Sequence, residues 1–200
     1  MNKNIYLVIV LLTSLTAYGK ELVDLKPVPL LEFMQDDLIQ SYPINILVPT
    51  EYKAFEFEAD EPGKYYWMRP KDAIKAIKSD ELPTKKGFMY GKITMNVDYD
   101  ANKDLFIGVE DAETQKHMET YFDEFSMQRA LVNGYPVLLI KMMHKEVEKP
   151  TYLMYIATKI STNVLVITYI PPKYSVKKGD YVWGKQLALF KQSKTQASEH

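Results

Sequence analysis

Three apolar runs between Tyr135 and Pro172 form the strongest pattern in this sequence. A charged segment that contains a proline, Lys145 to Pro150, separates the first run from the second, and Ser161-Thr162-Asn163 separates the second from the third. Short apolar runs divided by turn residues predict three antiparallel strands in a meander. Both sets of alternating positions are apolar, whereas a strand with one face in water alternates with polar residues. We therefore expect this sheet to be covered on both faces.

Shorter apolar segments upstream predict the remaining strands of the same sheet. Together with the meander they indicate an α+β fold, a mostly antiparallel twisted sheet of six or seven strands flanked by helices. The upstream strands are expected at Ile44–Val48, Phe55–Glu58, Tyr65–Met68, Phe88–Val97 and Leu105–Val109.

Helical periodicity predicts three helices. Pro70 opens the first, Lys71 to Ser79, which places Ala73, Ile74 and Ile77 on one face. The second is expected from Glu113 to Val132, with Asn133-Gly134 as a left-handed cap. The third runs from Tyr181 to Lys191, with Trp183, Leu187 and Phe190 facing the sheet.

The N-terminus has the layout of a secretory signal peptide. Asn2-Lys3-Asn4 is a short positive region, Ile5 to Leu15 is apolar but too short to span a bilayer, and Ala17-Tyr18-Gly19 suits a cleavage site. We expect a periplasmic or secreted protein that is soluble after cleavage and begins at Lys20. The remaining divisions are an extended lead at 20–29, one α+β domain at 30–191 and a disordered tail at 192–200.

Candidate chemistry is sparse, so the sequence predicts a protein that is not an enzyme and carries no cofactor or metal. Asp98 to Asp104 resembles a calcium loop, but Lys103 replaces the required glycine and Val109 the closing glutamate, which favours a hairpin loop. Glu113, His117 and Tyr121 share a helical face, yet two ligands do not make a metal site. The absence of cysteine and of Gly-x-Ser-x-Gly removes the common nucleophiles.

The formal net charge of −1 and the alternation of acidic and basic segments argue against nucleic acid as a partner. Aromatic residues are the unusual feature, since the chain contains 15 tyrosines. Tyr65, Tyr66, Trp67 and Arg69 lie close together, and these residue types are enriched in protein interfaces. We expect part of this group to be exposed and to contact a partner; the alternative is that its members are core.

The order of elements resembles that of the PsbP-like group of exported bacterial proteins, over roughly Leu30 to Phe190. The resemblance implies an α/β/α sandwich without a catalytic motif, in a group that includes immunity proteins against type VI secretion toxins. It rests on residues 133–140, 152–157 and 164–170, and on Trp183, Leu187 and Phe190.

Two functions remain open at this point. The first is non-enzymatic binding of another protein, such as a secreted toxin that an immunity protein neutralises, or an envelope component. The second is binding of a small ligand or a weakly held metal in a pocket between sheet and helix, with His117 or Glu113 nearby. Oligomeric state does not follow from the sequence.

Overall fold

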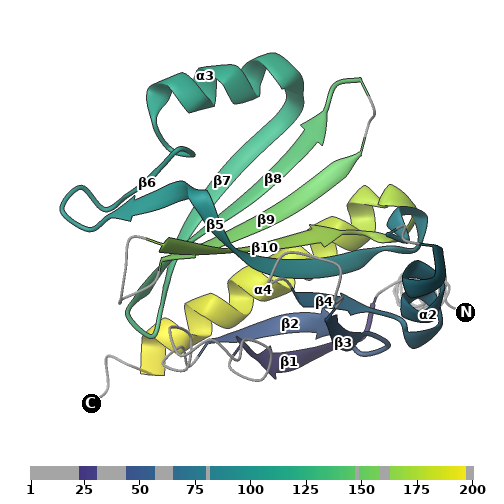
Figure 1. Cartoon of the computed structure of the whole chain (residues 1–200). Coiled ribbons are helices and arrows are strands. Elements are labelled where there is room, and N and C mark those ends of the chain that lie inside the picture. The colour runs from purple at the N-terminus through teal and green to yellow at the C-terminus, as the bar shows by residue number, and fades with distance from the viewer. Residues whose placement is uncertain are drawn as a thin grey trace, which may run out of the picture.

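The computed structural model describes residues 23–30, 44–56, 65–79, 82–146, 149–157 and 163–196. The predicted signal peptide lies outside these residues. Seven antiparallel strands follow one another across the main sheet in the order β3-β4-β5-β10-β9-β8-β7, and β6 pairs with β5 (Figure 1). The strands of this sheet are β3 (Lys53–Glu56), β4 (Tyr65–Met68), β5 (Phe88–Asp100), β6 (Leu105–Ile107), β7 (Phe122–Val132), β8 (Tyr135–His144), β9 (Pro150–Ala157) and β10 (Asn163–Ile170).

Three α-helices and a second small sheet complete the described part of the fold. The helices are α2 (Pro70–Ser79), α3 (Ala112–Tyr121) and α4 (Val176–Gln196), with 3-10 turns η3 (Thr84–Lys86) and η4 (Pro172–Tyr174). In the small sheet, β1 (Leu25–Pro29) pairs with β2 (Asn45–Pro49), so part of the predicted extended lead is a strand. The α+β class and the antiparallel sheet are confirmed. The closing helix is also confirmed, and it continues past its predicted end at Lys191.

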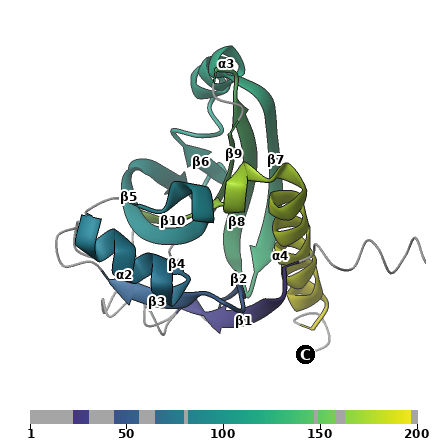
Figure 2. The same ribbon diagram turned by 90° about the vertical axis from the view of Figure 1, so that its right-hand side faces the viewer.

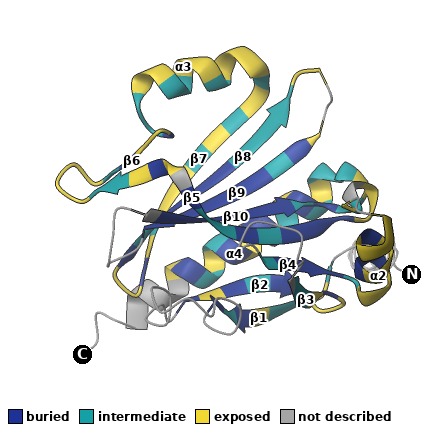
Figure 3. Ribbon diagram, in the orientation of Figure 1, coloured by how far each residue is buried: buried dark blue, intermediate teal, exposed yellow. Residues whose placement is uncertain are grey.

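The meander of β8, β9 and β10 is buried on both faces, as the sequence predicts (Figure 3). One face carries Leu139, Met154 and Ile167 in the largest cluster of core residues. The opposite face carries Ile140 and Val166 in a separate cluster. The absence of alternating polar residues in these strands is therefore explained by packing on both faces of the sheet.

The two faces are covered by different kinds of element. The first packs against α4 and the small sheet, through residues such as Phe190 and Ile46 (Figure 2). The second packs against the far end of β5, β6 and the turn that follows, through Phe106 and Val109. Strand β5 changes register against β10 at Asn163/Val164. Such an irregularity bends a strand, which allows β5 and β6 to fold over the sheet. Over the meander, this second face is therefore not covered by the helix predicted from Glu113 to Val132. Helix α2 does pack on the same face, over β4 and β5, where Ala73 joins Tyr66 and Phe88 in a third core cluster.

The predicted helix from Glu113 to Val132 is wrong in its second half. Helix α3 ends at Tyr121, and the chain continues as β7, which pairs with β8 along its length. Asn133 and Gly134 have positive φ angles, 50° and 80°. Two such residues suit a two-residue β-hairpin, so they connect β7 to β8 and do not cap a helix. No residue of α3 is buried, and therefore this helix does not pack on the sheet as expected (Figure 3).

The helix predicted after Pro70 forms, but a different face of it is buried. Ile74 and Ile77 are 55% and 61% exposed, whereas Asp72, Ala73 and Ala76 are buried. The Arg69 guanidinium pairs with the Asp72 carboxylate at 2.6 Å. This ion pair allows a charged side chain to lie on the buried face, which the apolar pattern alone does not predict.

The loop that resembles a calcium site joins β5 to β6 as a hairpin, as predicted. The Asp100 carboxylate accepts the backbone N–H groups of Asn102 and Lys103 at 3.0 and 3.2 Å. Desolvation is the largest single effect on Asp100 and would raise its pKa, but these two bonds and the interaction with the Lys103 ammonium together outweigh it and lower the pKa. The Asp100 carboxylate thus serves the turn itself.

Candidate functional site

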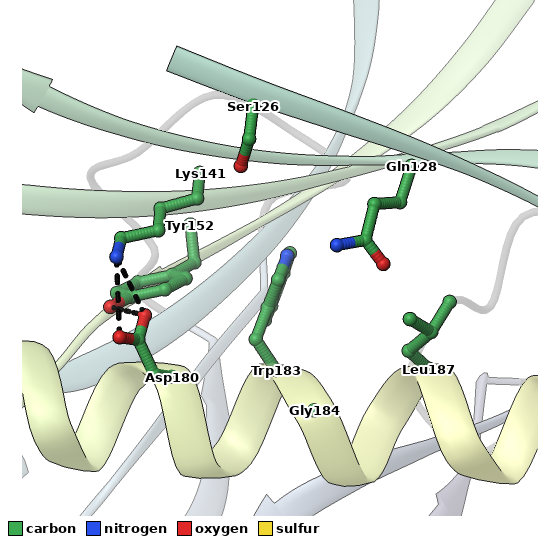
Figure 4. A pocket seen from close by; sticks show the side chains of 8 residues that line it. All are labelled: Ser126, Gln128, Lys141, Tyr152, Asp180, Trp183, Gly184 and Leu187. Atoms are coloured by element: carbon green, nitrogen blue, oxygen red, sulfur yellow. Dashed lines mark hydrogen bonds and ion pairs between the residues drawn. The ribbon is translucent and has the colours of Figure 1, made fainter. Parts of the chain in front are cut away.

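A pocket of about 240 Å³ lies between strands β7, β8 and β9 on one side and helix α4 on the other (Figure 4). It lies on the sheet face that α4 covers. Its lining comes from β7, β8, β9 and α4, and consists of Ser126, Gln128, Lys141, Tyr152, Asp180, Trp183, Gly184 and Leu187.

The strand side of the pocket follows from the register of the sheet. Ser126 on β7 lies opposite Lys141 on β8, and Lys141 lies opposite Tyr152 on β9. Residues that are paired in this way share a face, so three neighbouring strands present one row of polar groups. Gln128 stands two residues beyond Ser126, on the same face of β7.

The helical side of the pocket follows from the periodicity of α4. Asp180, Trp183, Gly184 and Leu187 are spaced three, one and three residues apart, so they form one stripe along the helix. Gly184 leaves the middle of the stripe open: a Cβ atom there would have no heavy atom within 4 Å. Bulky neighbours on either side of a glycine therefore produce a hollow over the sheet.

One end of the pocket is fixed by an ion-pair network. The Lys141 ammonium lies 2.9 Å from the Glu124 carboxylate and 3.0 Å from that of Asp180. The Tyr152 hydroxyl donates a hydrogen bond to Asp180 at 2.8 Å. Burial alone would lower the pKa of Lys141, but its hydrogen bonds to the two carboxylates outweigh this and raise it. Desolvation, followed by the bond to Asp180, raises the pKa of Tyr152.

Tyr152 reaches Asp180 because a glycine precedes that aspartate. A Cβ atom at Gly179 would lie only 2.1 Å from Cε2 of the Tyr152 ring. The same hydroxyl is 3.2 Å from the carbonyl oxygen of Val176, in the first turn of α4. The tyrosine thus fastens the beginning of α4 to the middle of the sheet.

Trp183 carries the unexplained polar group of the pocket. Its ring centroid is 5.5 Å from that of Tyr152, and its side chain is only 9% exposed. The indole Nε1 is buried and has no hydrogen-bond partner among the described residues. Figure 4 shows the nitrogen at the end of the ring that faces the strands, with the Gln128 amide directed toward it. An unmade hydrogen bond of a buried donor costs about 1–3 kcal/mol.

The chemistry that this arrangement supports is recognition by hydrogen bonds. The pocket offers the indole N–H, the Gln128 amide and the Ser126 hydroxyl beside the apolar side chain of Leu187. The Tyr152 hydroxyl and the Lys141 ammonium are already engaged with carboxylates. Across the described ranges, no cluster of three or more potential metal ligands occurs.

The residues that the sequence suggests for binding a partner or a ligand do not line this pocket. Tyr66 and Trp67 are buried in the core, while Tyr65 and Arg69 are half-buried. The role of these four residues in partner binding stays a prediction. Of the four, only Tyr65 and Arg69 expose enough of their side chains to contact a partner. Glu113 and His117 lie on the exposed helix α3 and do not line the pocket; the His117 ring contacts the Tyr121 ring at a tilt of 51°, with 4.6 Å between the ring centroids.

Sequence reasoning missed the pocket residues on β7 because it placed them in a helix. The alternation of Glu124, Ser126 and Gln128 with Phe125 and Met127 is the pattern that predicts a strand there. Asn-Gly directly after an alternating segment is in addition a strong hairpin signal. With that assignment, Ser126 could have been placed opposite the polar residue Lys141, with Gln128 two residues away on the same face of the strand.

Comparison with known proteins places the chain in no family. No protein-family model matches it, and no curated protein sequence matches it. A crystal structure of PA94, a Pseudomonas aeruginosa protein of unknown function suggested to be a regulator, shares 10% identity with a TM-score of 0.33. That match covers 82% of this chain and 93% of the other. No helix in the described part of the chain is long and apolar enough to cross a membrane.

Proposed function

We propose that this protein is a non-enzymatic binder of a small polar molecule, which it holds in the pocket between the meander and α4. The buried Trp183 Nε1, which lacks a partner among the described residues, is the observation that carries this proposal. A bound acceptor atom would recover the free energy that this donor loses on burial.

The walls of the pocket support the same function because they are held in place before any ligand arrives. The contacts of Lys141 and Tyr152 with Asp180 join three secondary-structure elements at one end of the pocket. Fixed walls reduce the ordering that binding has to impose, and this favours affinity. The same contacts leave neither side chain available as a nucleophile or a base.

Gly184→Leu is expected to abolish binding while the fold persists, because the added side chain would occupy the open centre of the pocket. A thermal-shift screen of small polar compounds measures this. Compounds that raise the Tm of the wild type in proportion to ln(1 + [L]/Kd) should leave the variant unchanged. Lys185→Leu is the matched control, because this exposed position points about 100° away around the same helix. Equal shifts in Gly184→Leu and the wild type would contradict the proposed site.

Binding of another protein is the second candidate, and the surface of α2 favours it. Ile74 and Ile77 are exposed apolar side chains in one stretch of this helix. Exposed lysines, Lys71, Lys75 and Lys78, accompany them. A partner for this surface would present an apolar patch with acidic residues at its rim, such as a toxin or an envelope protein.

Ile74→Glu with Ile77→Glu should abolish capture of such a partner from envelope extracts and leave the Tm nearly unchanged. Both side chains are mostly in water, so little stability depends on them. Capture by the double variant at the level of the wild type would exclude this surface.

Both candidate functions are proposed for the periplasm. The support is the signal-peptide layout of residues 1–19, which lie outside the described part of the chain.

A further inference from the structure

We infer that the ligand of this pocket is an uncharged carboxamide or peptide-like amide whose carbonyl oxygen accepts the Trp183 indole N–H. This inference rests on the proposed function and adds the chemical class of the ligand. Three features of the pocket carry it: its donors and acceptors, its charge and its size.

The indole N–H and the Gln128 amide together match an amide group. Trp183 Nε1 can only donate, so the ligand must bring an acceptor to the buried end of the pocket. Gln128 donates through its NH₂ and accepts through its carbonyl oxygen. The side chain of Gln128 is exposed and points toward the indole (Figure 4). An amide in the ligand could therefore bond Gln128 in both directions while its oxygen also faces the indole.

The charges at the pocket disfavour an anionic acceptor. Lys141 is the cation in the lining, and it is paired with both Glu124 and Asp180. One positive charge against two negative charges leaves an excess of one negative charge. A carboxylate or a phosphate would meet this excess and would find no uncompensated cation in the lining. A neutral carbonyl supplies the same acceptor without that repulsion.

A cationic ligand is disfavoured for a different reason, the absence of a hydrogen-bond acceptor. The excess negative charge would attract an amidinium or ammonium group, but neither group has an acceptor for the indole N–H. Two donors would then face each other at the buried end of the pocket. Only an uncharged group with both donor and acceptor satisfies the charge and the hydrogen-bond pattern together.

The size of the pocket limits the ligand to a small compound or one side chain of a larger one. Its volume of about 240 Å³ lies below the range of about 300–1,000 Å³ that is usual for drug-sized ligands. This corresponds to roughly eight water molecules at their liquid volume of about 30 Å³. A monocyclic amide fits this space, and Leu187 provides apolar contact for its ring.

Benzamide, benzoate and benzamidinium test the inference, because the three probes share a size and a shape but differ in charge. Saturation-transfer NMR titrations of the full chain give the dissociation constants. Benzamide is expected to bind at least about tenfold more tightly than either charged probe, a difference of about 1.4 kcal/mol. Gln128→Leu should weaken benzamide binding by about tenfold, since two neutral hydrogen bonds are lost. Gln115→Leu on α3 is the control and should leave it unchanged.

Tighter binding of either charged probe, or an unchanged dissociation constant in Gln128→Leu, would overturn the assigned class. Failure of all three probes to bind would overturn it as well. The proposed function is judged separately, because the Gly184→Leu screen tests the pocket without regard to the class of the ligand.

Discussion

Replacement of Trp67 by alanine is expected to lower the free energy of unfolding by about 3–5 kcal/mol. The side chain is 2% exposed and belongs to the largest cluster of core residues. Strand β4, which carries it, lies between β3 and β5, so neighbouring strands limit collapse into the space left behind. The indole ring also packs against Gly91 on β5, where a Cβ atom would lie 3.4 Å away.

Urea unfolding of single alanine variants measures this effect. Tyr65→Ala is the comparison within the same strand, and its smaller loss is expected to be about 1–2 kcal/mol because Tyr65 is only half-buried. If Trp67→Ala were as stable as the wild type but lost a partner, the aromatic group would be an interface anchor, and its place in the core would be wrong.

Gly179→Ala is expected to cost about 1–3 kcal/mol or more, although alanine favours helices. The new methyl group would lie 2.1 Å from Cε2 of Tyr152. Relief requires the ring to move, and the ring is held by hydrogen bonds to Asp180 and Val176. The substitution would therefore loosen the beginning of α4 and distort the charged end of the pocket.

Gly184→Ala, the same change five residues further along the helix, is the matched control. No heavy atom would lie within 4 Å of the new methyl group. Because glycine weakens a helix, this variant should gain about 0.5–1 kcal/mol. Thermal or urea unfolding of the two variants gives opposite signs if Tyr152 is placed as described. Losses of equal size at both positions would contradict that placement.

The part of the fold that sequence predicts best is the part in which local pattern and tertiary packing agree. The meander and α4 are such cases, because their apolar positions coincide with the buried faces of the structure. The segment from 122 to 132 is the opposite case. Its apolar residues are spaced in a way that a helix can also accommodate, so the alternation at 124–128 and the Asn-Gly that follows have to be weighed against a helical pattern; pairing with β8 decides in favour of the strand.

The pocket could not be predicted because its residues are distant in sequence. Ser126, Lys141 and Tyr152 become neighbours through strand register, and Asp180 joins them only when α4 crosses the sheet. Neither a motif nor a periodicity links them. The aromatic cluster illustrates the converse limit: its composition resembles an interface, but burial of Tyr66 and Trp67 depends on strands that pair with it on both sides.

The most direct test of ligand binding in this pocket is a heteronuclear NMR titration that follows the two tryptophan indole N–H signals of the chain. Trp183 lines the pocket, whereas Trp67 is a core residue that does not. Addition of any compound that raises the Tm should shift the Trp183 signal to saturation and leave the Trp67 signal in place. A stabilising compound that left the Trp183 signal unchanged would show that the binding site lies elsewhere.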